Sequence, residues 1–121
     1  MPESIKDVNS CGDLIQCAFS LNGFEVEVYE TLLTTGPLSA NDLADRMGKD
    51  RSTVYRALQK MLSCGMVYRE TRSIPRGGYY HVYRAIPRSE LRERLEGCVE
   101  GWYRKMRAVL EQFEEEGGKP L

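Results

Sequence analysis

One short segment of the sequence, GKDRSTVYRALQKM at residues 48–61, combines basic and hydroxyl side chains at helical spacing. Its apolar residues recur every three or four positions, which predicts one buried stripe on a helix, formed by Val54, Ala57, Leu58 and Met61. The basic and hydroxyl side chains are left to the other sides of that helix. Such groups can bind phosphate oxygens and the edges of bases, so the segment indicates nucleic-acid binding.

Positive charge is concentrated around this segment, although the whole chain of 121 residues has a net charge of only -1. Residues 1–48 carry two basic and eight acidic residues, a net charge of -6. Residues 49–86 carry eight basic and two acidic residues, a net charge of +6, and residues 87–121 carry seven basic and eight acidic residues. A basic middle third is the electrostatic pattern expected of a nucleic-acid contact.

Other classes of function have little support in the sequence. No P-loop, dinucleotide fingerprint or nucleophile motif is present, so we expect no catalytic residue, no cofactor and no enzyme activity. The single histidine, His81, is distant from every cysteine and no two cysteines form a CxxC pair, which argues against a metal site. The four cysteines are Cys11, Cys17, Cys64 and Cys98. No apolar run approaches the ~20 residues of a membrane helix and no secretory signal is visible, so we expect a cytoplasmic protein without membrane contact.

Two helices and a helix-turn-helix are expected in the first half of the chain. After a loose tail, apolar spacing predicts a helix at residues 11–21 and another from about 24 to 35. Ser39 and Asp50 are expected to cap two short helices that are separated by the sequence Gly-Lys-Asp at 48–50.

The second half is expected to hold a β-hairpin and one long helix. Residues 66–86 change to alternating polarity around a turn at 75–78, which predicts two strands. Ser89 is expected to cap a helix at 90–116, whose continuous apolar stripe needs a partner surface, most economically a second subunit. The expected dimer interface consists of Leu91, Leu95, Cys98, Trp102, Met106, Val109 and Phe113.

Together these elements predict a mainly α-helical winged helix-turn-helix with a long C-terminal dimerisation helix. The expected organisation is a loose tail at 1–10, a DNA-binding domain at 11–86 and a dimerisation helix at 87–121.

Three motifs and the wing carry a family resemblance. They are Glu-x-x-Val-Tyr-x-x-Leu-Leu from residue 25, Gly-Pro-Leu-Ser-Ala-x-x-Leu-Ala from residue 36, Arg-Ser-Thr-Val-Tyr-Arg-Ala-Leu from residue 51, and the wing sequence at 77–84. Residues 21–86 thereby resemble the DNA-binding domain of archaeal TrmB-type regulators, and more distantly the MarR and ArsR groups. Full-length TrmB-type sugar regulators continue into a large effector-binding domain. This chain is similar instead to the short, single-domain members, so the resemblance does not imply sugar sensing.

The helix-turn-helix layout predicts how these residues meet DNA. A recognition helix at about 50–63 would enter the major groove, and the wing at 66–86 would follow the flanking backbone or minor groove. Base-edge contacts are expected from Arg51, Ser52, Thr53 and Arg56. Tyr55 is expected at a phosphate or a base, and phosphate contacts are expected from Lys49, Lys60, Ser39 and Asn41. Wing contacts are expected from Arg72, Arg76, Gly77 and Gly78.

The sequence thus predicts a homodimeric, sequence-specific regulator of transcription that binds double-stranded DNA, with repression as its expected mode of action. A two-fold dimer would read a pseudo-palindromic operator with half-sites ~10 base pairs apart. Two alternatives stay open. One is a winged-helix module that contacts proteins of the transcription machinery. The other is a redox-responsive regulator in which oxidation of Cys64 disturbs the recognition helix. The sequence identifies no small-molecule effector.

Overall fold

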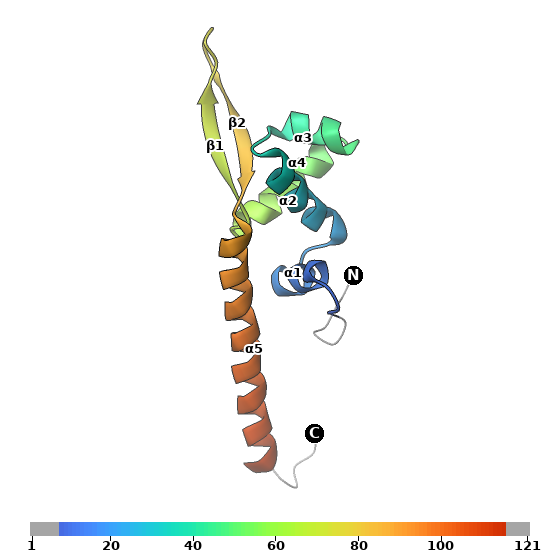
Figure 1. The fold of residues 1–121 in the computed structure, drawn as a ribbon, viewed down its shortest axis with the longest axis vertical. Coiled ribbons are helices and arrows are strands. Elements are labelled where there is room, and N and C mark those ends of the chain that lie inside the picture. Colours follow the sequence, from blue (N-terminus) through green and yellow to red (C-terminus); the bar gives the residue numbers. More distant parts are fainter. Residues whose placement is uncertain (1–7, 116–121) are drawn as a thin grey trace.

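A computed structural model describes residues 8–115, in which helices pack beside a two-stranded wing and one long helix extends away from it (Figure 1). The helices are α1 (Cys11–Phe19), α2 (Gly23–Thr35), α3 (Ala40–Met47), α4 (Arg51–Ser63) and α5 (Arg88–Glu115). The strands are β1 (Val67–Ser73) and β2 (Tyr79–Ala85), paired antiparallel. The predicted mainly helical fold with a hairpin and a long last helix is confirmed. The predicted tail falls largely on residues 1–7, outside the described residues.

Local side chains set where the first four helices begin. Ser10, Asn22, Ser39 and Asp50 each precede a helix and accept a hydrogen bond from the backbone N–H three residues later. At α2 the arrangement is reciprocal, because the Glu25 carboxylate also accepts from the backbone N–H of Asn22 at 2.8 Å. The caps predicted at Ser39 and Asp50 are therefore confirmed.

The predicted start of α5 and the predicted end of α1 were both wrong. Helix α5 begins at Arg88, so Ser89 lies inside its first turn rather than at the cap. The carbonyl of Pro87 accepts from the N–H groups of Glu90 and Leu91, both at 3.1 Å, and this starts the helix earlier. Helix α1 ends at Phe19 rather than at residue 21, because Ser20 takes a left-handed conformation with φ of 55°.

The apolar stripe of α4 forms the centre of the core. Val54, Leu58 and Met61 have no exposed surface, and Ala57 is also buried. They pack in one cluster with residues of α2, α3 and the sheet, among them Val28, Tyr29, Leu32, Leu43, Val67 and Tyr83. The predicted buried stripe is confirmed, and its burial turns the opposite face of α4 to solvent.

A short backbone bridge joins the helix-turn-helix to the wing. Leu38 and Tyr83 exchange two backbone hydrogen bonds, of 3.2 and 2.8 Å, just before α3 begins. Within the hairpin, Arg69 stands opposite Tyr83 and Thr71 opposite His81, so these four side chains share one face. The bridge therefore holds the start of α3 beside this face of the wing.

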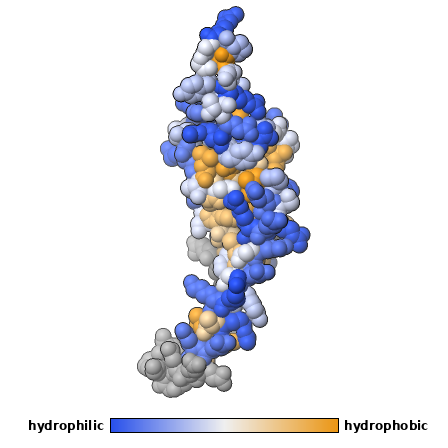
Figure 2. All heavy atoms as spheres, turned by 90° about the vertical axis from the view of Figure 1, so that its left-hand side faces the viewer, coloured by the Kyte–Doolittle hydropathy of each residue, from blue (hydrophilic) through white to orange (hydrophobic). Residues whose placement is uncertain are grey.

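Helix α5 is packed at its beginning and exposed beyond it. Leu91 is buried and Leu95 packs against the core, and the Arg94 guanidinium donates to the carbonyls of Cys64 and Gly65 at 3.2 and 2.7 Å. These carbonyls end α4, so α5 holds the end of the core helix. Further along, Val99, Met106, Val109, Leu110 and Phe113 are 46–57% exposed. Figure 2 shows apolar atoms among hydrophilic ones on this lower part of the molecule.

Replacing Tyr29 by Phe should destabilise the fold by removing one buried hydrogen bond. The Tyr29 hydroxyl, on a side chain only 1% exposed, donates to the Ile86 carbonyl at 2.8 Å. We expect the free energy of unfolding in urea to fall by about 1–2 kcal/mol, because the Ile86 carbonyl is left without this partner. Tyr103→Phe, at an exposed position of α5, is the control and should change nothing. Equal stability of Tyr29→Phe and the native chain would contradict this account of the core.

Candidate nucleic-acid interface

A hollow of about 410 Å³ lies where the starts of α3 and α4 meet the wing. It is lined by Ser39, Ala40, Asn41, Arg51, Tyr55, Arg69, Tyr80, His81 and Tyr83. We call these residues the α3–α4–wing cleft. The Leu38–Tyr83 bridge lies beside it, because Ser39 follows Leu38 directly and Tyr83 itself lines the cleft.

Four of the residues predicted to bind DNA meet in this cleft. Ser39 caps α3 and Asn41 lies in its first turn, while Arg51 and Tyr55 come from the first turns of α4. Ser52 lies beside Arg51 and Tyr55 in an adjoining surface hollow. Arg51 and Arg56 are exposed, and neither forms an ion pair with another residue in the range 8–115. Both guanidinium groups are therefore available to an external anion or base.

Five residues of the cleft were not among the predicted site residues: Ala40, Arg69, Tyr80, His81 and Tyr83. Arg69 is exposed and lies next to Tyr83 across the sheet, which turns it toward the start of α3. The His81 ring lies 3.2 Å from the Thr71 hydroxyl and its centroid 5.9 Å from that of Tyr79. Alternation within each strand could have suggested which residues share a face, but only the register shows that Arg69 and His81 lie on the same face of the hairpin.

The hydroxyl groups of Ser52 and Thr53 are engaged within the protein. Both donate to the carboxylate of Asp50, in the case of Thr53 at 2.6 Å, while the Thr53 N–H also donates to it. These hydrogen bonds lower the pKa of Asp50 to about 2. Ser52 and Thr53 thus keep lone pairs, and Thr53 a methyl group, for contacts at the surface of α4. Their hydroxyl protons are donated to the Asp50 carboxylate, which is ionised at neutral pH.

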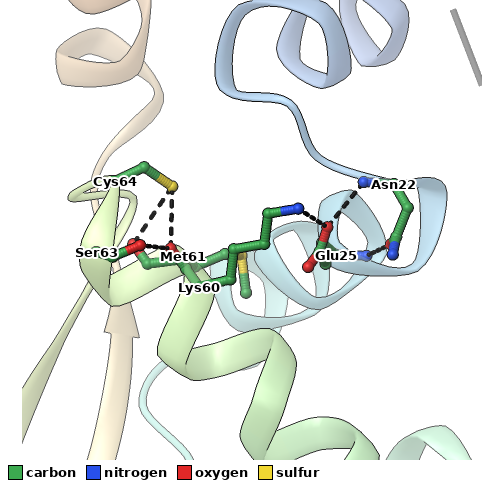
Figure 3. Close-up of polar contacts among 6 residues, drawn as sticks. All are labelled: Asn22, Glu25, Lys60, Met61, Ser63 and Cys64. Carbon is green, nitrogen blue, oxygen red and sulfur yellow. Dashed lines mark hydrogen bonds and ion pairs between the residues drawn. The ribbon is translucent and has the colours of Figure 1, made fainter.

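The two predicted phosphate-binding lysines lie in different surroundings. Lys60 is nine residues after Arg51, or about 13 Å along the helix, and its ammonium group pairs with the Glu25 carboxylate at 3.4 Å (Figure 3). Lys49 stands in the turn before α4, with its ammonium group 5.9 Å from the centroid of the Phe24 ring. Lys49 therefore belongs to the same end of α4 as the cleft, and Lys60 does not.

The wing residues that were predicted to contact DNA lie outside the cleft. Arg76, Gly77 and Gly78 form the exposed tip, where both glycines have positive φ values of 105° and 86°. Arg72 lies 3.7 Å from the carboxylate of Glu70, which also accepts a 2.8 Å hydrogen bond from Arg84. The Arg84 hydrogen bond is the main reason why the pKa of Glu70 is lowered. Arg72 is thus partly neutralised, whereas Arg76 forms no ion pair with any residue that the structure describes.

The cysteines are all free thiols. Cys64 lies at the end of α4, and its thiol donates to the Lys60 carbonyl at 3.3 Å and turns back onto the last turn (Figure 3). Burial raises the pKa of this thiol. A raised pKa reduces the thiolate that oxidants attack, so the geometry disfavours Cys64 as a redox sensor.

Two further features bear on the kind of site. Across residues 8–115, no three His, Cys, Asp or Glu side chains lie close enough together to hold a metal ion. Over the same range, no helix is long and apolar enough to cross a membrane.

Comparison with known proteins identifies the class. Residues 15–89 match the family described as sugar-specific transcriptional regulator TrmB, and the chain belongs to this family. It is 40% identical over 101 residues to an uncharacterized protein of Methanocaldococcus jannaschii, covering 84% of this chain and 76% of that protein. The resemblance to TrmB-type regulators is confirmed. By family the chain is a transcriptional regulator, its fold is that of winged-helix regulators, and proteins of this class are generally not enzymes.

Solved structures share the winged fold. A possible transcriptional regulator from Methanosarcina mazei Go1 is 21% identical with a TM-score of 0.78, covering 88% of this chain and 96% of that one. The archaeal chromatin protein TrmBL2 is 23% identical with a TM-score of 0.56, covering 86% of this chain and 36% of that one. Regulators described as MarR family and ArsR-like also match, which confirms the more distant resemblance.

The cap at Asp50 should make stability depend on pH in strong acid. Its pKa in the folded protein, about 2, lies below the usual value of 3.8, so its stabilising effect is complete above about pH 4 and is lost as the pH falls through about 2. Asp50→Asn keeps an N-cap acceptor that does not titrate. We expect the thermal midpoint of the native chain to fall more than that of Asp50→Asn between about pH 4 and pH 2. Parallel decreases would show that Asp50 is not the titrating cap.

Proposed function

We propose that this protein is a homodimeric, sequence-specific regulator that represses transcription by occupying a pseudo-palindromic site in double-stranded DNA. The observation that carries the proposal is the α3–α4–wing cleft, which brings together the start of α3 and cations of α4 and β1 that have no ion-pair partner among residues 8–115. Arg51 from α4 and Arg69 from β1 both line this hollow. The basic residues of the 49–86 segment supply the electrostatic attraction.

Helix α4 would lie in the major groove with its first turns toward the bases. The exposed guanidinium groups of Arg51 and Arg56 would each bond to a guanine in bidentate fashion, and the Thr53 methyl group would contact thymine. Ser52 and Tyr55 would contact a base edge or a phosphate beside them. The Asp50 carboxylate, which holds both hydroxyl groups, would disfavour a phosphate at the centre of this surface.

Further residues would bind phosphate groups of the DNA backbone beside these base contacts. Ser39 and Asn41 stand at the N-terminus of α3, where the helix dipole favours an anion. Lys49 would bind the backbone on the same side. Lys60 would have to leave Glu25 to do so, which makes it the weakest of the predicted contacts.

The wing would contact the DNA at two levels. Arg69 and His81 at its base would bind the backbone next to α4, while Arg72, Arg76, Gly77 and Gly78 would reach the flanking backbone or minor groove. The two glycines at the tip bring the backbone close to a groove without the bulk of side chains.

Repression is the simpler mode of action, because it requires only that the site be occupied, whereas activation requires a further contact with the transcription machinery. A two-fold dimer would present two α4 helices to half-sites about 10 base pairs apart. We assign the protein to the cytoplasm, together with the DNA that it would bind.

A winged-helix module that contacts proteins is the second candidate, and salt dependence separates it from the first. Phosphate binding releases counterions, so the DNA affinity of a true DNA-binding protein falls steeply with salt. We expect the affinity for a 30–40 base-pair duplex to fall by about 10³-fold or more between roughly 50 and 200 mM salt. Absence of DNA binding at the lower salt concentration would favour the protein-contact role.

Arg56→Ala should weaken binding to the selected site by about 1–3 kcal/mol if Arg56 reads a base. The loss on unrelated duplexes should be smaller, because those complexes lack the base contact. Arg107→Ala is the matched control, since it removes an exposed arginine from α5, far from the cleft, and should leave both affinities unchanged. Equal losses on specific and unrelated DNA would show that Arg56 binds only phosphate.

A further inference from the structure

The apolar stripe of α5 is symmetric about Trp102. Its members are Leu91, Leu95, Cys98, Trp102, Met106, Val109 and Phe113, and the intervals between them are four, three, four, four, three and four residues. Leu91, Trp102 and Phe113 are thus 11 residues apart, a spacing that keeps a stripe nearly straight along an α-helix. Reading the stripe backwards from Phe113 gives the same pattern as reading it forwards from Leu91. A stripe of this kind can pair with an antiparallel second copy of itself so that every residue of the stripe faces a stripe residue of the other copy.

The two halves of the stripe differ in shape. The first half is flanked by α1, and between α1 and α5 lies an apolar groove of about 600 Å³. The groove includes Leu14, Ile15, Leu91, Leu95 and Val99. The second half is a bare helix on which Met106, Val109, Leu110 and Phe113 are 54–57% exposed. One half therefore offers an apolar hollow, and the other offers apolar side chains with nothing against them in the described chain.

We propose that two copies of this chain pair through antiparallel α5 helices with the two-fold axis at Trp102. The second half of each helix would then fill the groove of the other subunit. In this register Phe113 stands opposite Leu91 of the second copy, Val109 opposite Leu95, and Met106 opposite Cys98. The proposal rests on the homodimer of the proposed function and adds its direction, its register and the occupant of the groove.

The groove favours this direction over a parallel one. A parallel pair would bring two first halves together, each widened by α1, and would leave two narrow second halves to pair alone. The antiparallel pair instead places each narrow half against a wide one. At about 100° per residue, Leu110 and Val99 fall on the same flank of the stripe, which is the flank that borders the groove. Leu110 of one copy would therefore enter the groove of the other beside Phe113.

Site-directed cross-linking tests this register. The natural cysteines are first removed as Cys11→Ser, Cys17→Ser, Cys64→Ala and Cys98→Ala, and the background protein is checked for its sedimentation mass and DNA affinity. Leu95→Cys and Val109→Cys are then prepared separately, one with a size tag, and treated with a short bismaleimide alone and after mixing. Trp102→Cys is the third variant, because in this register residue 102 of one subunit faces residue 102 of the other.

The antiparallel register predicts a cross-linked dimer only in the mixture of Leu95→Cys and Val109→Cys, and in Trp102→Cys alone. Leu95 of the two copies would be 14 residues apart along the pair, or about 21 Å, beyond the reach of the reagent. Cross-linking of Leu95→Cys to itself, or of Val109→Cys to itself, would overturn the proposal in favour of a parallel pair. A dimeric background protein without any of these products would overturn α5 as the interface.

The same samples separate this inference from the proposed function. A background protein that sediments as a monomer and still binds one selected DNA sequence would overturn the dimer while leaving DNA binding intact. A cross-linked antiparallel dimer that binds no DNA would support the pairing and overturn the regulator.

Discussion

Burial of one face of α4 is the constraint on which the rest of this structure depends. Val54, Leu58 and Met61 are fully enclosed by α2, α3 and the sheet, so the helix cannot rotate about its axis without exposing them. Its outward residues, with Arg51 and Arg56 among them, are thereby held in one direction. The Asp50 cap fixes where the helix begins, and Arg94 of α5 holds its end. A surface formed on such a helix is pre-organised before any ligand arrives.

The base of the wing is held by the same core, in which Val67, Tyr83 and Ala85 are buried. The Leu38–Tyr83 bridge ties β2 to the segment before α3, and the Tyr29 hydroxyl ties α2 to the end of β2. The outer part of the hairpin, residues 71–80, is exposed up to its glycine tip. The cleft is therefore held firmly where Leu38 and Tyr83 are bonded, whereas the outer wing has little packing to hold it. A firmly held α4 beside a less constrained wing suits a duplex whose groove width varies with sequence.

Local rules predicted the elements well, because the capping residues, glycine stops and apolar spacing act within a few positions of one another. They placed α4 and its buried face correctly, and they failed at Ser89, where Pro87 started the helix earlier. The site was harder to predict, since it depends on contacts between distant segments. Arg69 and His81 join the cleft only through the strand register and the bridge to Leu38. The pairing of Lys60 with Glu25 likewise required the packing of α2 against α4, which residue types alone do not reveal.

The central claim is that this surface reads a DNA sequence, and selection from a genome tests it most directly. Fragmented genomic DNA would be incubated with the protein at low and at higher salt, and the bound fragments would be sequenced. The account predicts that a shared, roughly two-fold symmetric sequence is recovered at both salt concentrations and is more enriched at the higher one. Fragments without a common sequence, lost as the salt concentration rises, would contradict the claim and indicate a protein that coats DNA without reading it.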